Sequence, residues 1–259
     1  MKISEDYEYA TTEKEEEISF KTCLICFLDL LGSTEAIEND EILFFTSVYE
    51  IFNAAKEMCV EYGHLLKYDN IKMKAFSDNI IFVYELPEDN NYEKVCYAVQ
   101  TMVSFVSIFQ FLALNKRILL RGGLTVGNVF FSDMFVWGKG LVEAYKMENN
   151  LAIYPRVLVN QKVLNLLIDH DGKIKYGITV YCDNDAQCYI DFLSQVNQQD
   201  RPFLISHING IINSLKEKYK NNIRVLQKIA WLESYVVLFK KTNNITDDMI
   251  DKAIEMFNQ

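Results

Sequence analysis

The sequence has few of the residues that interrupt regular structure. Its 259 residues include only 10 glycines and 3 prolines, and half of the chain is hydrophobic. Disordered and low-complexity proteins have the opposite composition, so this chain is expected to fold around a sizeable core. The length fits one large domain, or one domain with an extension.

Positive charge is also scarce. Lysine and arginine number 26 against 36 aspartates and glutamates, which gives a formal net charge of −10. Nucleic-acid-binding proteins usually present a basic face, and anionic membrane surfaces attract basic proteins. We therefore expect no nucleic-acid partner and no membrane partner. An anionic ligand such as a nucleotide would need metal ions or local basic groups for its binding.

The sequence shows neither a signal peptide nor an apolar run that approaches the roughly 18 residues of a membrane helix. Residues 1–19 hold seven acidic side chains against two lysines, which is typical of a solvated arm. We expect a cytoplasmic protein with an acidic flexible arm over residues 1–19.

The cysteines form no recognisable framework. Cys23 and Cys26 have C-x-x-C spacing, but they lie within an apolar run with no second cysteine pair or histidine nearby. This pattern favours buried free thiols in a reducing compartment over a zinc or redox site. The other cysteines are Cys59, Cys96, Cys182 and Cys188; the histidines His64, His170 and His207 lack ligand spacing and receive no catalytic role.

Hydrophobic periodicity and turn residues predict an α+β fold. The expected elements are a strand at 20–29, a helix at 33–62, a hairpin at 64–86, a helix at 91–114, strands at 117–127 and up to 138, a helix at 140–149, and a short strand after Pro155. The order β-α-β-β-α-β is ferredoxin-like, with an antiparallel-rich sheet and helices on one face. Residues 160–195 remain unassigned, and residues 196–259 are expected to form a C-terminal helical extension on a catalytic domain at 20–195.

Two aspartates stand where apolar runs end. Asp29 closes the first strand, and Asp78 stands at the turn of the hairpin. If these strands pair, the carboxylates approach each other, because neighbouring strands lie about 4.8 Å apart. Carboxylate oxygens with open positions suit Mg²⁺ or Mn²⁺, completed by substrate phosphates. Each aspartate alone is more simply a helix cap or a turn residue, and it is their joint placement that favours a metal site.

The residues after Asp29 favour phosphate binding. Leu31, Gly32 and Ser33 lead into the long helix, whose free amides and positive dipole end attract anions. Together with the two aspartates, this arrangement predicts a two-metal site for phosphoryl transfer.

At this point residues 20–160 resemble the class III nucleotidyl cyclases. F-L-D-L-L-G from Phe27 is similar to their first metal-binding segment, and K-A-F-S-D from Lys74 is similar to their K-x-x-G-D, with serine in place of glycine. R-G-G-L-T-V-G from Arg121 resembles their R-x-G-I-H-x-G strand. Trp137-Gly138 followed by K-M-E-N from Lys146 resembles their W-G…R-M-E-S helix.

The departures narrow the resemblance. Val142 replaces the asparagine that is usual in the family, Lys146 replaces the arginine, and Phe135 replaces the aspartate that reads adenine. The segments F-S-D-N-I, R-G-G-L, G-L-V-E-A-Y-K-M-E and Y-P-R-V, with Lys228-x-x-Trp231-Leu232, are together similar to the pyrimidine cyclases of bacterial Pycsar antiphage systems.

This resemblance implies a uridylate cyclase, with CTP the next candidate substrate after UTP. The 3′-hydroxyl attacks the α-phosphate, giving the 3′,5′-cyclic monophosphate, which activates a separate effector in antiphage defence. Two divalent ions, Mn²⁺ or Mg²⁺, would be held by Asp29, Asp78 and the Leu30 carbonyl. The implied catalytic residues are Lys146 and Arg121; the implied substrate-binding residues are Phe27, Leu31, Gly32, Ser33, Lys74 and Phe135.

Lys74, the position of the family's base-reading lysine, lies four residues before Asp78, roughly 13 Å along a strand. One nucleotide can hardly contact both within one subunit, so the resemblance implies a homodimer with composite sites. Simpler roles stay open: a surface lysine at Lys74 or Lys146, a structural ion pair for Arg121, and core packing for Phe135. For the whole chain, the alternatives are a degenerate cyclase-homology domain that binds a nucleotide or dimerises, and a purine cyclase.

Overall fold

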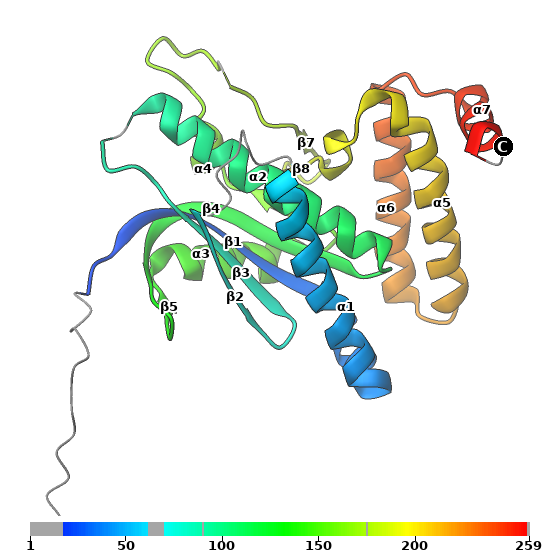
Figure 1. Cartoon of the computed structure of the whole chain (residues 1–259), viewed down its shortest axis with the longest axis horizontal. Coiled ribbons are helices and arrows are strands. Elements are labelled where there is room, and N and C mark those ends of the chain that lie inside the picture. Colours follow the sequence, from blue (N-terminus) through cyan, green and yellow to red (C-terminus); the bar gives the residue numbers. More distant parts are fainter. Residues whose placement is uncertain (1–17, 62–69, 90, 175, 258–259) are drawn as a thin grey trace, which may run out of the picture.

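The computed structural model describes residues 18–61, 70–89, 91–174 and 176–257 (Figure 1). Almost all of the expected acidic arm, the expected helix stop at Gly63 and the first part of the expected hairpin lie outside these ranges. The main elements are β1 Lys21–Leu31, α1 Ser33–Glu61, β2 Ile71–Phe76, β3 Asn79–Glu85, α2 Tyr92–Asn115, β4 Leu119–Phe131, β5 Val136–Trp137, α3 Lys139–Leu151, β6 Val157–Val159, α4 Gln161–Asn165, β7 Val180–Cys182, β8 Cys188–Ile190, α5 Arg201–Lys218, α6 Ile223–Thr242 and α7 Asp247–Phe257.

The first six elements confirm the ferredoxin-like order expected from the sequence. The sheet runs β2-β3-β1-β4-β6-β8-β7, with β5 paired to β4. The pairs β2–β3, β3–β1 and β1–β4 are all antiparallel, and the β4–β6 pair is parallel. The fold is therefore α+β, and its central strand β1 ends between the β2–β3 turn and the start of β4.

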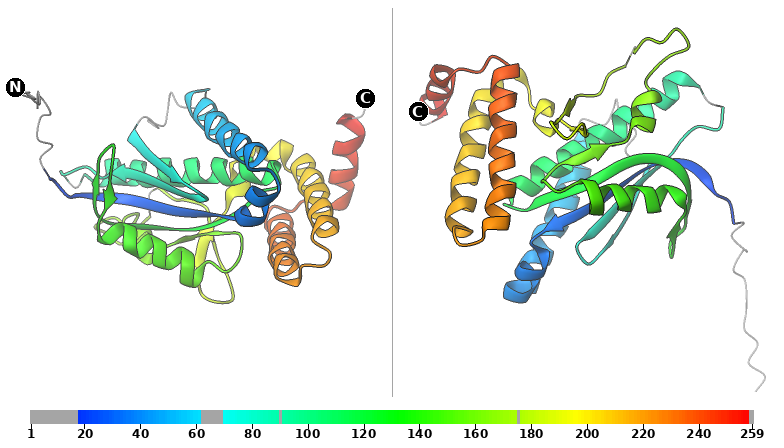
Figure 2. Two further views of the ribbon diagram at one scale, coloured as in Figure 1. Left: turned by 90° about the horizontal axis from the view of Figure 1, so that it is seen from below. Right: turned by 180° about the vertical axis from the view of Figure 1, so that it is seen from behind.

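Alternating side chains of β1 face two different layers. Leu24, Cys26 and Leu28 belong to the large core beneath α1 and α2, as expected for two helices on one face. Cys23, Ile25 and Phe27 point to the other face, where they pack with Ala144 of α3. Helix α3 therefore covers the face that the sequence analysis had left without a helix, as Figure 2 shows from below.

Helix α2 is the most apolar part of the core. Among the described residues it is the one helix whose length and composition would allow it to cross a membrane, a feature that the sequence analysis overlooked. Most of it is buried inside the protein, where Phe105 and Phe109 meet Phe82 of β3 edge to face. Its composition is thus accounted for by its place as a core helix.

Close packing of α3 explains the glycines of β4. A Cβ on Gly123 would lie 2.5 Å from Met147 Cβ, and one on Gly127 would lie 2.8 Å from Gly140 Cα. Any side chain at either position would push α3 off the sheet. The glycines therefore allow the backbone of α3 to pass closely over β4.

The apolar positions of α1 are buried only in the second half of the helix. Ile42 and Phe45 are 78% and 65% exposed, whereas Ile51 and Ala55 are buried. Asp40 interrupts the helix with φ −159° and ψ 88°, and the segment around it projects beyond the sheet (Figure 1). The apolar periodicity of α1 therefore extends into its N-terminal half, which has no sheet beneath it.

The C-terminal part supplies three helices, within the two or three expected. Helix α5 packs against α2, α6 and α7, and the α5–α6 pair lies beside one end of the sheet (Figures 1 and 2). Residues 160–195, which the sequence left unassigned, include α4, the β7–β8 hairpin and the 3-10 turn Phe192–Gln195. A Cys182–Cys188 disulfide joins β7 to β8. Cys23 and Cys26 are free and buried, which confirms the expectation for this pair, and Cys96 is free and buried as well.

Candidate functional site

The end of β1 and the turn of the β2–β3 hairpin form one site. Asp29 pairs in register with Asn79, the residue that follows Asp78. The Leu30 amide donates to the Asp78 carbonyl at 3.1 Å. The strand pairing therefore brings Asp29 and Asp78 to the same end of adjacent strands, as the sequence analysis required.

Local contacts hold the Asp78 carboxylate in place. Ser33 Oγ donates to Asp78 Oδ2 at 2.5 Å, and Asn79 Nδ2 donates to Asp78 Oδ1 at 3.1 Å. Gly32, with φ +81°, makes the left-handed turn that takes the chain from β1 into α1. Ser77 also has a positive φ, 53°, at the position where the resembled motif has glycine. The two left-handed residues, Gly32 and Ser77, therefore both lie in turns that border Asp78.

Asp29 belongs to a second set of contacts, centred on Arg121. Arg121 lies opposite Asp29 in the β1–β4 register and donates from Nε to Asp29 Oδ2 at 3.0 Å. Its Nη2 lies 2.8 Å from Glu148 Oε1, on α3. Arg121 therefore makes the ion pair that the sequence analysis gave as its structural alternative, and one of its partners is a candidate metal ligand.

Glu148 is the buried member of this set. Its side chain is only 4% exposed, and burial raises its pKa to about 7. Arg121 opposes that shift, while Asp29 and Asp78 add to it. Asp29, Asp78 and Glu148 therefore form a concentration of negative charge that one arginine only partly compensates.

The donor atoms fit a hard divalent cation. Asp29 and Asp78 supply carboxylate oxygens, and the backbone of Leu30, which directly follows Asp29, lies beside Asp78 through its amide hydrogen bond. No group of three histidine, cysteine or acidic side chains in the described ranges forms a closed metal cage. Mg²⁺ needs no such cage, since it is usually bound by one or two carboxylates together with water and substrate phosphates.

Lys74 lies away from the aspartates, on the outer strand β2. It lines a cavity of about 600 Å³ together with Phe27 and Tyr145, and the two rings meet edge to face at 5.5 Å. The Lys74 Nζ lies 5.6 Å from the ring centre of Phe131. Lys74 of β2 pairs with Ile81 of β3, and Ile81 pairs with Phe27 of β1. The backbone of Lys74 is therefore two strand spacings, roughly 10 Å, from that of Phe27.

Lys146 and Phe135 occupy another part of the same face. Lys146 is exposed and lines a cavity of about 710 Å³ with Trp137 and Val142. Lys146 and Glu148 are two positions apart on α3 and face different directions, and it is Glu148 that reaches Arg121. Phe135 and Trp137 are 56% and 69% exposed, so core packing, the simpler role left open for Phe135, is wrong.

The remaining predicted substrate residues lie around the β1–α1 junction. Phe27 is buried beneath Tyr145, Leu31 packs against the large core, and Ser33 is buried beside Asp78. The sequence analysis missed two residues near this site. Glu148 was considered only as part of the K-M-E-N motif. The signal that could have identified it is an acidic residue on the buried side of an amphipathic helix. Lys228 was likewise considered only as part of a motif, Lys228-x-x-Trp231-Leu232. No local pattern indicated that α6 reaches the site.

Comparison with known proteins gives distant matches to solved structures alone. No family model matches the sequence, and no curated protein does. The structure of the adenylyl cyclase CyaB from P. aeruginosa is similar with a TM-score of 0.45 and 17% identity, over 67% of this chain and 94% of that one. The guanylyl cyclase Cya2 gives 0.42 and 13%, over 66% and 92%. A class III adenylyl cyclase-like ATP-binding protein from Pseudomonas aeruginosa gives 0.37 and 12%, over 59% and 37%.

Proposed function

We propose that this protein is a nucleotidyl cyclase that converts a nucleoside triphosphate into its 3′,5′-cyclic monophosphate and pyrophosphate. The observation that carries the proposal is the meeting of Asp29 and Asp78 at the end of adjacent strands, beside the first turn of α1. Two carboxylates next to a helix N-terminus favour a metal-bound phosphate chain.

The reaction needs bond exchange at one phosphorus atom. The 3′-oxygen forms a bond to the α-phosphorus, its proton passes to solvent, and the bond from that phosphorus to the pyrophosphate oxygen breaks. Divalent ions held by Asp29, Asp78 and the Leu30 carbonyl would supply the positive charge that activates the hydroxyl and stabilises the leaving pyrophosphate.

The chain itself orients the substrate. Free amides at the start of α1, after Gly32, bind the phosphate chain, and the hydroxyl of Ser33 keeps the Asp78 carboxylate in one orientation. Arg121 fixes the Asp29 carboxylate against β4 and compensates the buried Glu148. In this proposal Arg121 is a positioning residue, because its ion pairs with Asp29 and Glu148 are both to protein carboxylates.

The base and the transferring phosphate are contacted by a second copy of the chain. Lys74 and Lys146 line cavities on the α3 side of the sheet that include neither Asp29 nor Asp78, and Phe135 directly precedes β5. Their surroundings include exposed Met134, Trp137 and Val142, an apolar surface that suits a subunit contact. In a homodimer, each site takes its aspartates from one copy and these three residues from the other.

We propose a pyrimidine substrate, UTP before CTP, and a role in antiphage signalling through a separate effector. The support is the sequence: Phe135 replaces the adenine-reading aspartate, and the combined segments resemble the Pycsar cyclases. A purine cyclase stays an alternative because Lys74 is retained. A nucleotide-binding domain without activity is the second alternative, motivated by Val142 and Lys146 in place of asparagine and arginine.

The test is product analysis by mass spectrometry after incubation of the full chain with ATP, GTP, CTP and UTP and Mn²⁺. The proposal expects a single cyclic pyrimidine monophosphate and an equal amount of pyrophosphate. Cyclic AMP or cyclic GMP would support the purine alternative. Absence of any cyclic product, together with nucleotide binding, would support the inactive binding domain.

A further inference from the structure

Helix α6 of the C-terminal extension reaches the end of the sheet that carries the site. Leu232 of α6 lines a small cavity with Leu119 and Leu120, the two residues that precede Arg121 in β4. Lys228 lies one helical turn before Leu232 and therefore on the same side of α6. The helix thus carries Lys228 toward the start of β4, close enough for the charges of Arg121 and Asp29 to act on it, although about 200 residues of chain separate Asp29 from Lys228.

The surroundings of Lys228 are those of a cation without a partner. It is half-buried, and within the described part of the chain no carboxylate lies at ion-pair distance from it. Burial lowers the pKa of Lys228 and the nearby Arg121 lowers it further, whereas Asp29 raises it. A partly desolvated ammonium beside two other charged groups is costly unless an anion compensates it.

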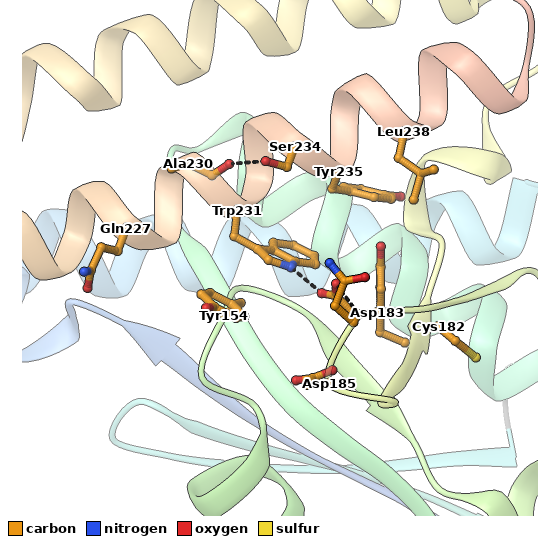
Figure 3. A pocket seen from close by; sticks show the side chains of 12 residues that line it. Tyr154, Cys182, Asp183, Asp185, Gln227, Ala230, Trp231, Ser234, Tyr235 and Leu238 are labelled. Carbon is orange, nitrogen blue, oxygen red and sulfur yellow. Dashed lines mark hydrogen bonds between the residues drawn. The ribbon is translucent and has the colours of Figure 1, made fainter.

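Helix α6 is fixed in orientation by an aromatic cluster three residues after Lys228, shown in Figure 3. Trp231 Nε1 donates to Asp183 Oδ2 at 2.8 Å, on the β7–β8 turn. The indole ring stacks on Tyr235, with ring centres 5.7 Å apart, and lies 6.0 Å from the ring of Tyr154. These contacts restrict rotation of α6 about its axis, so the direction of Lys228 is restricted as well.

A buried arginine ties this cluster to the sheet. Arg156 is 1% exposed; its guanidinium lies 5.4 Å from the ring centre of Tyr154 and 5.8 Å from that of Trp231. It pairs with Asp183 at 2.7 Å and with Asp185. Arg156 directly precedes β6, which pairs with β4, so α6, the hairpin and the catalytic sheet are joined through one residue.

We propose that Lys228 binds the phosphate chain of the nucleotide, supplied by the same subunit as Asp29 and Asp78. This inference rests on the proposed function for the identity of the ligand. Arg121 is already paired with Asp29 and Glu148, and Lys146 faces another cavity, so neither offers a free charge to the phosphates of its own chain's site. The extension is then part of the substrate site.

The test measures binding of inorganic tripolyphosphate with Mn²⁺ to the full chain by calorimetry, in parallel with KM for the preferred nucleotide. Lys228→Met is expected to weaken tripolyphosphate binding about tenfold or more and to raise KM more than it lowers kcat. Lys228→Arg retains most of the affinity because it retains the charge. Lys241→Met, an exposed lysine on the same helix, is expected to stay within about twofold of the wild type.

Wild-type affinity in Lys228→Met would overturn the inference, and so would a wild type that does not bind tripolyphosphate. A Lys228→Arg variant as weak as Lys228→Met would also overturn it, since a packing role would then suffice. The two proposals fail separately. Loss of tripolyphosphate binding in Lys228→Met from a wild type that makes no cyclic nucleotide would uphold the phosphate site and reject the cyclase.

Discussion

Ser33 Oγ donates a 2.5 Å hydrogen bond to Asp78 Oδ2, which joins the first turn of α1 to the β2–β3 turn. Both residues are distant from each other in the sequence, and both border the junction where β1 ends. The bond orients a candidate metal ligand and ties the phosphate-binding turn to it. Neither turn is therefore free to move without the other.

Ser33→Ala tests this coupling. The variant loses a hydrogen bond to a charged group, which is expected to lower the free energy of unfolding by about 1.5–3 kcal/mol and to raise the Mn²⁺ concentration needed for half-maximal activity. Ser47→Ala on the same helix is the control, because Ser47 Oγ bonds only to the Leu43 carbonyl. Unfolding in urea and metal titration measure the two effects. Equal behaviour of both variants would show that the Asp78 carboxylate is oriented by other contacts.

The Arg121–Glu148 pair is expected to be strongly coupled. Arg121→Met leaves Glu148 buried without its cation and is expected to destabilise the protein by about 3 kcal/mol. In the double variant with Glu148→Gln, part of this loss is recovered, because the buried charge is gone. A coupling of at least about 1 kcal/mol is expected from denaturant unfolding.

Arg117→Met is the matched control for that cycle. Arg117 contacts Ser214 on α5 and lies before β4, outside the charge cluster. It is expected to change stability by no more than about 0.5 kcal/mol. If the effects of Arg121→Met and Glu148→Gln on the free energy of unfolding are strictly additive, the two side chains do not stabilise the fold through their ion pair.

Glu148 also predicts a pH dependence of stability. Its pKa is raised from 4.5 in the unfolded chain to about 7 in the folded protein. Between these values the folded state holds a proton that the unfolded state releases, so this group makes the fold less stable as the pH rises toward 7. Glu148→Gln removes the effect, and the stability of this variant relative to the wild type should increase from pH 5 to pH 8. The measurement is denaturant unfolding with EDTA present; a relative stability that is constant or falls would contradict it.

Composite sites predict complementation between inactive variants. Asp29→Asn damages the metal half of the site, and Lys74→Ala damages the base-binding half. In an equal, refolded mixture, half of the dimers hold one intact site, so about a quarter of wild-type activity should return. A mixture of Asp29→Asn with Asp78→Asn should stay inactive, because both residues serve the same half. Failure of the first mixture to regain activity would refute the shared site.

The sequence predicted those parts of the fold that are encoded by local patterns. The alternation in β1, the turn at Ser77-Asp78 and the long apolar helix α2 follow from spacing alone, and with them comes the meeting of Asp29 and Asp78. The glycines of β4 meet the backbone of α3, which follows β4 closely in the sequence.

What could not be predicted depends on contacts between distant segments. Exposure of Ile42 and Phe45 follows from where the sheet ends, which helical periodicity does not encode. The Cys182–Cys188 pairing requires the register of β7 and β8, two three-residue strands without a strong pattern. The approach of Lys228 to Arg121 depends on the packing of α6, for which one sequence offers no signal.

The most direct test of the central claim is pyrophosphate release and cyclic nucleotide formation by the wild type, Asp29→Asn and Asp78→Asn, with Asp171→Asn as the control. Asp171 is an exposed loop residue between α4 and β7. The account predicts that each of the first two substitutions lowers the rate about 100-fold or more while the fold is retained, and that Asp171→Asn has the wild-type rate. Full activity in either Asp29→Asn or Asp78→Asn would contradict the assignment of the site.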